Sequence, residues 1–124
     1  MPQQDVQNFI YNTVEEYMPM HGRRPRGDVP YPFGYIGLQI DSDNTFVEDE
    51  VNALVFTTVH LFGKLSEQAT LNNILAAIKR DIRAQRHTQH YFLNVRNISS
   101  RSNNDVDGNL DLIHVVLEVE IQTS

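Results

Sequence analysis

The residues of this chain best suited to acid–base or metal chemistry are its histidines, of which there are five in 124 residues. His87 and His90 form the sequence His-Thr-Gln-His, a spacing with which a helix or turn can present two imidazoles to one metal ion. A catalytic zinc ion takes three protein ligands, and neither a carboxylate nor a third histidine stands beside this pair in the sequence. We therefore expect a solvated segment at a helix end, with metal binding as the minor alternative.

A second candidate for cation chemistry is the acidic segment Asp-Ser-Asp-Asn-Thr-Phe-Val-Glu-Asp-Glu, residues 41–50. It begins like a calcium-binding EF-hand loop, in which alternate Asp and Asn side chains supply oxygen ligands. The sixth position of that loop requires glycine for a sharp turn, and here it is Phe46. A solvated, repelling loop is the better interpretation, and weak calcium binding stays open as an alternative.

Motifs that mark an active site are missing from this sequence. The chain has no cysteine, which removes disulfides and thiolate nucleophiles, and it has no phosphate-binding glycine loop, no G-x-S-x-G and no H-E-x-x-H. His60 and His114 fall within apolar strand patterns, where we expect hydrogen-bonded packing or interface residues. We therefore expect no enzymatic activity and no cofactor. The alternative is a small α+β enzyme or ligand-binding domain with His60 or His114 beside a buried carboxylate.

The charge balance limits the possible partners. Arg23, Arg24 and Arg26 form a short basic run within the glycine- and proline-rich loop Met20–Pro32, but the formal net charge is −6, from 10 Lys+Arg and 16 Asp+Glu. Tight nucleic-acid binding needs clustered cations to replace the counterions of the phosphates, so it is disfavoured. An acidic surface instead lets a polyanion slide past. The first residues show no secretory signal and no stretch suits a membrane span, so we expect a cytoplasmic protein.

Apolar periodicity predicts the elements of the first half of the chain. Apolar residues at helical spacing predict a helix over Asp5–Met18, and Pro19 ends it. Alternating apolar residues predict a strand over Phe33–Asp41. A second strand is predicted over Val51–Phe62, and both of its faces are substantially apolar. Such a strand is central and covered on both sides, and in a domain this small the second cover can come from another subunit.

The second half of the chain repeats this order. Apolar residues at i, i+3, i+4, i+7 and i+11 predict a helix from Ser66, its N-cap, to Gln85. Strands are predicted over Tyr91–Ile98 and Leu110–Gln122, with residues 99–109 as the turn between them. The order α-β-β-α-β-β predicts one α+β domain over residues 1–124. We expect an antiparallel sheet of about four strands with two helices packed on one face.

Four segments carry a resemblance to a known family: Val29–Ile40, Val55–Lys64, Leu71–Ile82 and Leu112–Ile121. In these segments and in element order the chain resembles the tail terminator and tail completion proteins of long-tailed bacteriophages. The resemblance implies a structural virion subunit in a homo-oligomeric, hexameric ring at the head-proximal end of the tail. This ring binds the tail tube protein, ends tube growth and joins the tail to a head-completion or connector protein. DNA passes through its lumen without sequence-specific binding, and no membrane is involved.

The long loops and the two-faced strand are where we expect contacts between subunits or rings. Long, polar loops in a small domain usually serve a function. The alternative for the whole chain is another head–tail connector or tube component. The residues expected at these interfaces are Arg23, Arg24, Arg26, Asp41, Asp43, Phe46, Glu48, Asp49, Glu50, Phe56 and His60.

Overall fold

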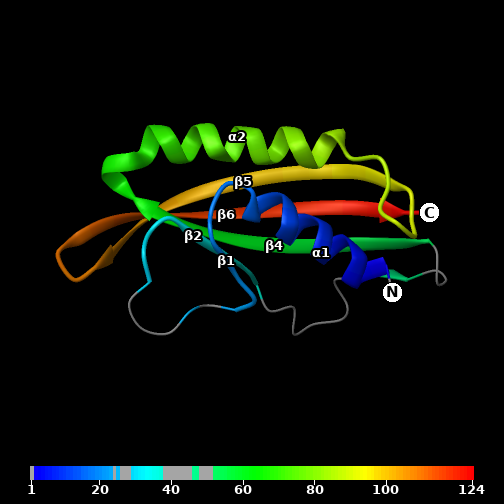
Figure 1. Ribbon diagram of the computed structural model, residues 1–124, viewed down its shortest axis with the longest axis horizontal. Coiled ribbons are helices and arrows are strands. Elements are labelled where there is room, and N and C mark those ends of the chain that lie inside the picture. The colour runs from blue at the N-terminus through cyan, green and yellow to red at the C-terminus, as the bar shows by residue number, and fades with distance from the viewer. Residues whose placement is uncertain (1, 24, 26–28, 38–45, 48–51) are drawn as a thin grey trace.

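The fold is α+β, as the order of apolar patterns predicts. The computed structural model describes residues 2–23, 25, 29–37, 46–47 and 52–124. Two helices lie against one curved sheet (Figure 1). The elements are, in chain order, α1 (Pro2–Glu15), β1 (Met20–His21), β2 (Phe33–Ile36), β3 (Phe46–Val47), β4 (Ala53–Lys64), the 3-10 turn η2 (Leu65–Glu67), α2 (Gln68–Ala84), β5 (Leu93–Asp107) and β6 (Leu110–Thr123).

The sheet has the strand order β1-β2-β4-β6-β5, and β3 pairs with the beginning of β4. The prediction of a central strand is confirmed, because β4 lies between β2 and β6 in antiparallel pairing. The prediction of an antiparallel sheet is correct for these strands and wrong at one edge, where β1 runs parallel to β2. The segment Met20–His21 was expected to be loop. It forms a strand because the Gly34 amide donates to the Pro19 carbonyl at 2.9 Å, which aligns the two segments.

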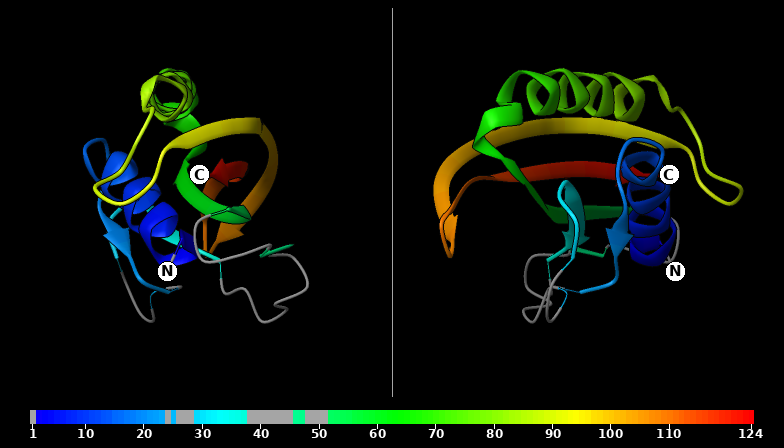
Figure 2. Two further views of the ribbon diagram at one scale, coloured as in Figure 1. Left: turned by 90° about the vertical axis from the view of Figure 1, so that its right-hand side faces the viewer. Right: turned by 60° about the vertical axis from the view of Figure 1, so that its left-hand side comes forward.

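Both helices cover the same face of the sheet, as expected (Figure 2). Odd-numbered side chains of β4 and β6 point to this face because successive strand residues alternate. Val55, Leu61, Leu117 and Ile121 are completely buried there, together with Ile78 of α2. The apolar stripe of α1 packs into the same core through Val6, Ile10 and Val14. Burying a side chain of this size stabilises the fold by about 1.5–3 kcal/mol.

Helix boundaries differ from those predicted by a turn or less. The first helix begins at Pro2, which suits a first-turn position because proline has no amide hydrogen to leave unbonded. It ends at Glu15, before the predicted Met18. Ser66 is not the N-cap of the second helix. It lies within η2, and the cap position is Glu67, which makes no capping hydrogen bond through its side chain.

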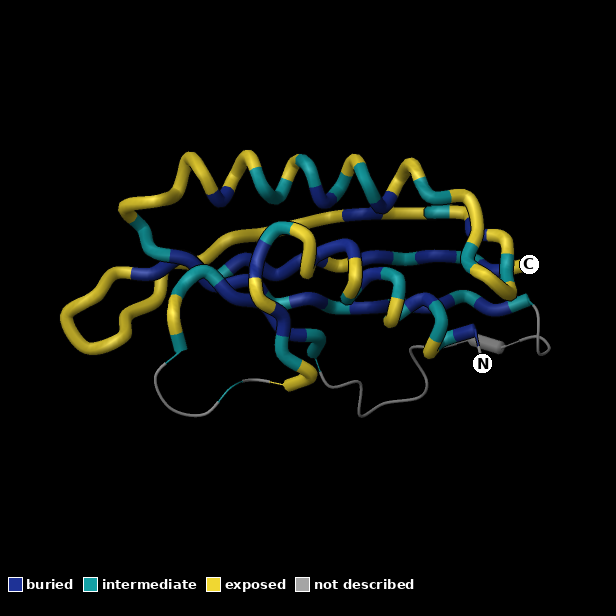
Figure 3. Tube along the Cα trace, in the orientation of Figure 1, coloured by how far each residue is buried: buried dark blue, intermediate teal, exposed yellow. Residues whose placement is uncertain are grey.

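The largest departure from prediction is the β5–β6 hairpin. Residues 99–107, predicted to be a turn, continue β5 in full register with β6, with one bulge between Val95 and Asn97. The turn itself is only Gly108 and Asn109, and Gly108 has a φ of +62° that an L-residue rarely adopts. Every residue of 99–107 is exposed (Figure 3). The β5 arm of the hairpin is therefore exposed, although its β6 partners Leu117, Val115 and Ile113 are buried and Lys79 of α2 donates to Ser100.

Candidate interaction surface

The face of the sheet opposite the helices carries a cluster of stacked rings, here called the aromatic cluster: Phe33, Tyr35, His60, Phe62 and His114. Strand register brings these rings together, because Phe33 pairs with Phe62, Tyr35 with His60, and Phe62 with His114. The Tyr35 and His60 rings stack at 4.9 Å between centroids, and the Phe62 and His114 rings at 4.3 Å. Phe33 and Tyr35 are buried without any contribution from the helices.

Two histidines meet inside this cluster. Nδ1 of His60 lies 2.8 Å from Nε2 of His114, so one ring nitrogen donates a hydrogen to the other. Such a bond fixes the tautomers of both rings and requires one of the two facing nitrogens to carry no proton. The hydrogen-bonded packing predicted for both residues is confirmed. The His60 ring also stacks on Tyr35 and the His114 ring on Phe62.

Next to the aromatic cluster the same face is acidic. Phe56, Thr58, Asn97, Glu118 and Glu120 line an open hollow of about 500 Å³. Glu118 is exposed and lies 3.8 Å from the guanidinium of Arg101 on β5. Since two carboxylates side by side repel a polyanion, this half of the face disfavours contact with phosphate and favours contact with polar or basic groups. The sheet face is thus divided into an aromatic half and an acidic half.

Among the predicted interface residues that the structure describes, two lie on the same strand face. Phe56 and His60 lie on the open face of β4, in the acidic half and the aromatic half respectively. Arg23 is exposed just after β1. Phe46 lies in β3 opposite Leu54. The predicted residues that lie outside the described part of the chain are Arg24, Arg26, Asp41, Asp43, Glu48, Asp49 and Glu50.

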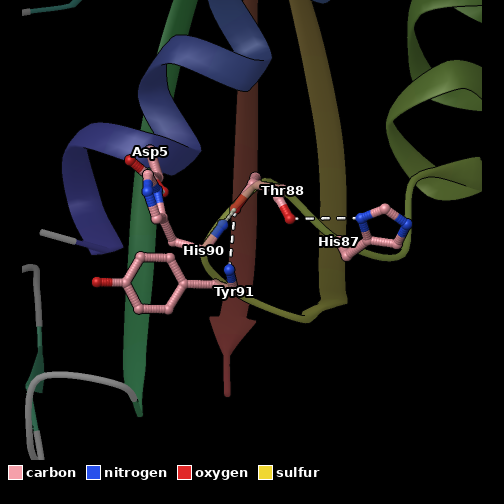
Figure 4. A network of polar contacts seen from close by, with 5 residues as sticks. All are labelled: Asp5, His87, Thr88, His90 and Tyr91. Carbon is pink, nitrogen blue, oxygen red and sulfur yellow. Dashed lines mark hydrogen bonds and ion pairs between the residues drawn. The ribbon is translucent and has the colours of Figure 1, made fainter.

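The two histidines of the His-Thr-Gln-His sequence have different partners (Figure 4). Nδ1 of His87 lies 3.3 Å from the Thr88 carbonyl oxygen, whereas Nδ1 of His90 lies 2.9 Å from a carboxylate oxygen of Asp5 on α1. Both rings are exposed beyond the end of α2, which is the solvated arrangement predicted for them. Within the described residues no group of three or more His, Cys, Asp or Glu side chains could hold a metal ion.

A polar contact also joins the two helices. The hydroxyl of Tyr17, just after α1, donates a hydrogen bond to the carboxylate of Asp81 on α2. This bond, reinforced by the neighbouring Arg80 guanidinium at 3.3 Å, holds the pKa of Asp81 below its ordinary value. The same bond raises the pKa of Tyr17, because the hydroxyl would lose its donor role on ionising beside a carboxylate. The contact links the segment after α1 to α2.

Sequence reasoning missed the hairpin as a surface feature. Its tip carries the exposed apolar residues Val106 and Leu110, which are 62% and 37% exposed, among several aspartates. The Tyr31 hydroxyl donates to Asp107 at 3.0 Å and ties the tip to the loop before β2. One signal for the hairpin was present, because an Asp-Gly step lies between the two segments that pair.

Comparison with known proteins supports the fold and gives no family. No family model matches the chain, and no curated protein matches it. Fifteen chains of known structure match. One of them, which carries no statement of function, has a TM-score of 0.55 and 13% sequence identity, and the match covers 98% of this chain and 92% of that one. At this identity the match shows a shared fold and nothing about activity. No helix among the residues described is long and apolar enough to cross a membrane.

Proposed function

We propose that this protein is a structural virion subunit that forms a ring at the head-proximal end of a phage tail, ends tube growth and joins the tail to the head connector. The observation that carries the proposal is the exposed β5–β6 hairpin. At about 3.3 Å per residue, the 15 residues of β5 span roughly 50 Å, whereas strands of globular domains usually have five or six residues. The β5 arm is exposed from Ser99 to Asp107, whereas the β6 residues that it pairs with from Leu112 to Leu117 are buried, apart from the half-buried His114. A long, exposed edge strand with a projecting tip is suited to contacting a neighbouring molecule.

Two further features support a ring. The open sheet face combines an aromatic half with an acidic half, and subunits that contact one another head to tail through unlike surfaces close into rings. The net charge of −6 suits a channel that DNA traverses without binding, because acidic walls repel phosphates. The resemblance of four segments to tail terminator proteins supplies the position in the tail. Hexameric symmetry and assembly in the host cytoplasm are parts of the proposal that come from this resemblance alone.

The test is assembly with the tail tube protein of the same phage. Purified protein is added to polymerising tube protein, and tube length and tube ends are recorded by negative-stain electron microscopy. We expect shorter tubes with a ring at one end. Protein with residues 106–111 replaced by a two-residue turn serves as the comparison, because this change keeps the pairing of Asp105 with Leu112. A protein that stays monomeric and leaves tube length unchanged contradicts the proposal. Filaments formed by the protein alone favour the alternative of a tube component.

A further inference from the structure

The hairpin tip is an acidic patch, here called the acidic tip, formed by Asp105, Asp107 and Asp111. No lysine or arginine lies between Asn103 and Asp111, and every residue in that span is exposed. Val106 is 62% exposed and pairs with Asp111 on one face of the hairpin, whereas Asp105 and Asp107 point to the other face. An exposed apolar side chain beside a carboxylate is suited to burial beneath a basic surface.

The C-terminal part of α2 is a basic patch, here called the basic helix end, formed by Lys79, Arg80, Arg83 and Arg86. Asp81 is the only acidic residue in this stretch, and Tyr17 and Arg80 bind its carboxylate. Arg83 and Arg86 are exposed and pair with no carboxylate among the described residues. These two guanidiniums are available to a carboxylate from another molecule.

The acidic tip and the basic helix end lie at opposite ends of the long axis of the molecule. In Figure 1 the hairpin projects at the left, whereas α2 begins near the hairpin base and runs away from it to the right. The two patches therefore cannot meet within one chain. Because they carry opposite charge and face outward at opposite ends, they match each other across two copies arranged head to tail.

We propose that the acidic tip of one copy binds the basic helix end of the next copy, and that this contact orders the subunits around the ring. The inference rests on the proposed ring function and names the surfaces that build it. Asp111 meets Arg83 and Arg86, and Val106, which shares its face of the hairpin, packs against the aliphatic stems of the arginines. Asp105 adds negative charge from the other face of the tip. Repetition of one unlike contact closes the ring, and salt weakens it because the pairs lie at the surface.

Charge reversal tests the contact. Asp105→Lys with Asp111→Lys reverses the tip and leaves the Tyr31–Asp107 bond in place. Arg83→Glu with Arg86→Glu reverses the helix end. Assembly is measured by mass photometry and sedimentation velocity over a range of protein concentrations. Each double variant is expected to raise the concentration at half-assembly by about tenfold or more, as loss of complementary charge does at other interfaces.

Two comparisons make the result specific. The four-substitution variant that reverses both patches restores opposite charges, and it is expected to assemble within about threefold of the wild type. The control variant carries Glu15→Lys and Glu16→Lys, two exposed positions at the end of α1. It changes the net charge by the same amount as the tip variant and should leave assembly unchanged. The proposal is overturned if this control weakens assembly as much as the tip variant does, or if the combined variant stays as weak as the two separate ones.

Cross-linking supplies a direct measurement, because the chain has no cysteine of its own. Asn109→Cys and Gln85→Cys proteins are mixed and treated with a short bismaleimide. A cross-linked dimer that forms only in the mixture is expected from the tip-to-helix contact. Rings that terminate tubes and yet give no such dimer overturn this inference and leave the proposed function standing. A wild-type protein that stays monomeric even on tube ends contradicts both the tip-to-helix contact and the proposed function.

Discussion

Gly34 of β2 offers a sharp test of the packing between the first strands, because its backbone approaches two buried side chains. A Cβ atom placed there lies 2.8 Å from Cδ2 of Leu61, 2.8 Å from Sδ of Met20 and 3.2 Å from the His60 carbonyl oxygen. Leu61 is completely buried and cannot turn outward, and the His60 carbonyl belongs to the central strand. Gly34→Ala therefore forces β1 and β2 away from β4.

Overpacking of this kind costs about 1–3 kcal/mol of unfolding free energy. With an unfolding entropy of about 2.1 cal/mol/K per residue, a chain of 124 residues loses roughly 4 °C of Tm for each kcal/mol. We therefore expect Gly34→Ala to lower Tm by about 4–12 °C in differential scanning calorimetry. The near-ultraviolet circular dichroism of the neighbouring Tyr35 should change at the same time, since its stacking on His60 depends on the position of β2.

Gly22 provides the matched control, because a Cβ there meets no atom within 4 Å and its φ is not positive. Gly22→Ala should leave Tm unchanged or raise it by a few degrees, since alanine restricts the unfolded chain by about 0.4–1 kcal/mol. A Gly34→Ala protein with a Tm within about 1 °C of the wild type refutes the close approach of the strands. Equal losses of Tm at Gly22 and Gly34 would show that replacement of any glycine lowers stability, and would also refute the close approach of the strands as the cause.

Three further substitutions probe the core and the polar contacts. Leu117→Ala removes a completely buried side chain of β6 and should lower the free energy of unfolding in urea by about 2–5 kcal/mol. A decrease under about 1 kcal/mol contradicts the burial of Leu117. Tyr17→Phe removes a hydrogen bond to Asp81 and should raise the pKa of that carboxyl. A lowered pKa stabilises the fold at pH above the unfolded-state pKa, and this contribution is lost as pH falls through the folded-state pKa. The difference in Tm from the wild type should therefore narrow as pH is lowered through the pKa of Asp81. His90→Ala removes the contact with Asp5 and should cost roughly 0.2–1 kcal/mol, with faster amide exchange confined to the segment after α2. Unchanged amide exchange in that segment contradicts the role of this contact in holding it to α1.

Local periodicity was enough to predict the helices and the buried faces of the strands. Leu71, Ile78 and Ile82 of α2 recur at helical spacing and are all buried, and the alternation along β6 matches its burial. These patterns depend only on neighbours along the chain, which a sequence displays directly. The hairpin depends on pairing instead. Ser, Asn and Asp residues 99–107 are typical of turns, and only the register with β6 makes them a strand.

The aromatic cluster of the candidate surface also depends on strand pairing, which local sequence patterns do not reveal. Strand alternation places Phe56 and His60 on one face of β4, as predicted from the sequence. The bond between His60 and His114 joins residues 54 positions apart, and it follows from the exact offset between β4 and β6. No local pattern encodes that offset, because it is set by the whole ladder of twelve residue pairs.

The polar side chains of β5 protect an exposed edge of the sheet. In the described part of the chain β5 is the last strand of the sheet, so its outer row of amides and carbonyls faces solvent over a long stretch. Such a row can template uncontrolled strand addition. Serine, asparagine and arginine residues along Ser99–Asn104 keep both faces hydrated and oppose that process. The polar composition of this edge therefore opposes aggregation of the protein at high concentration.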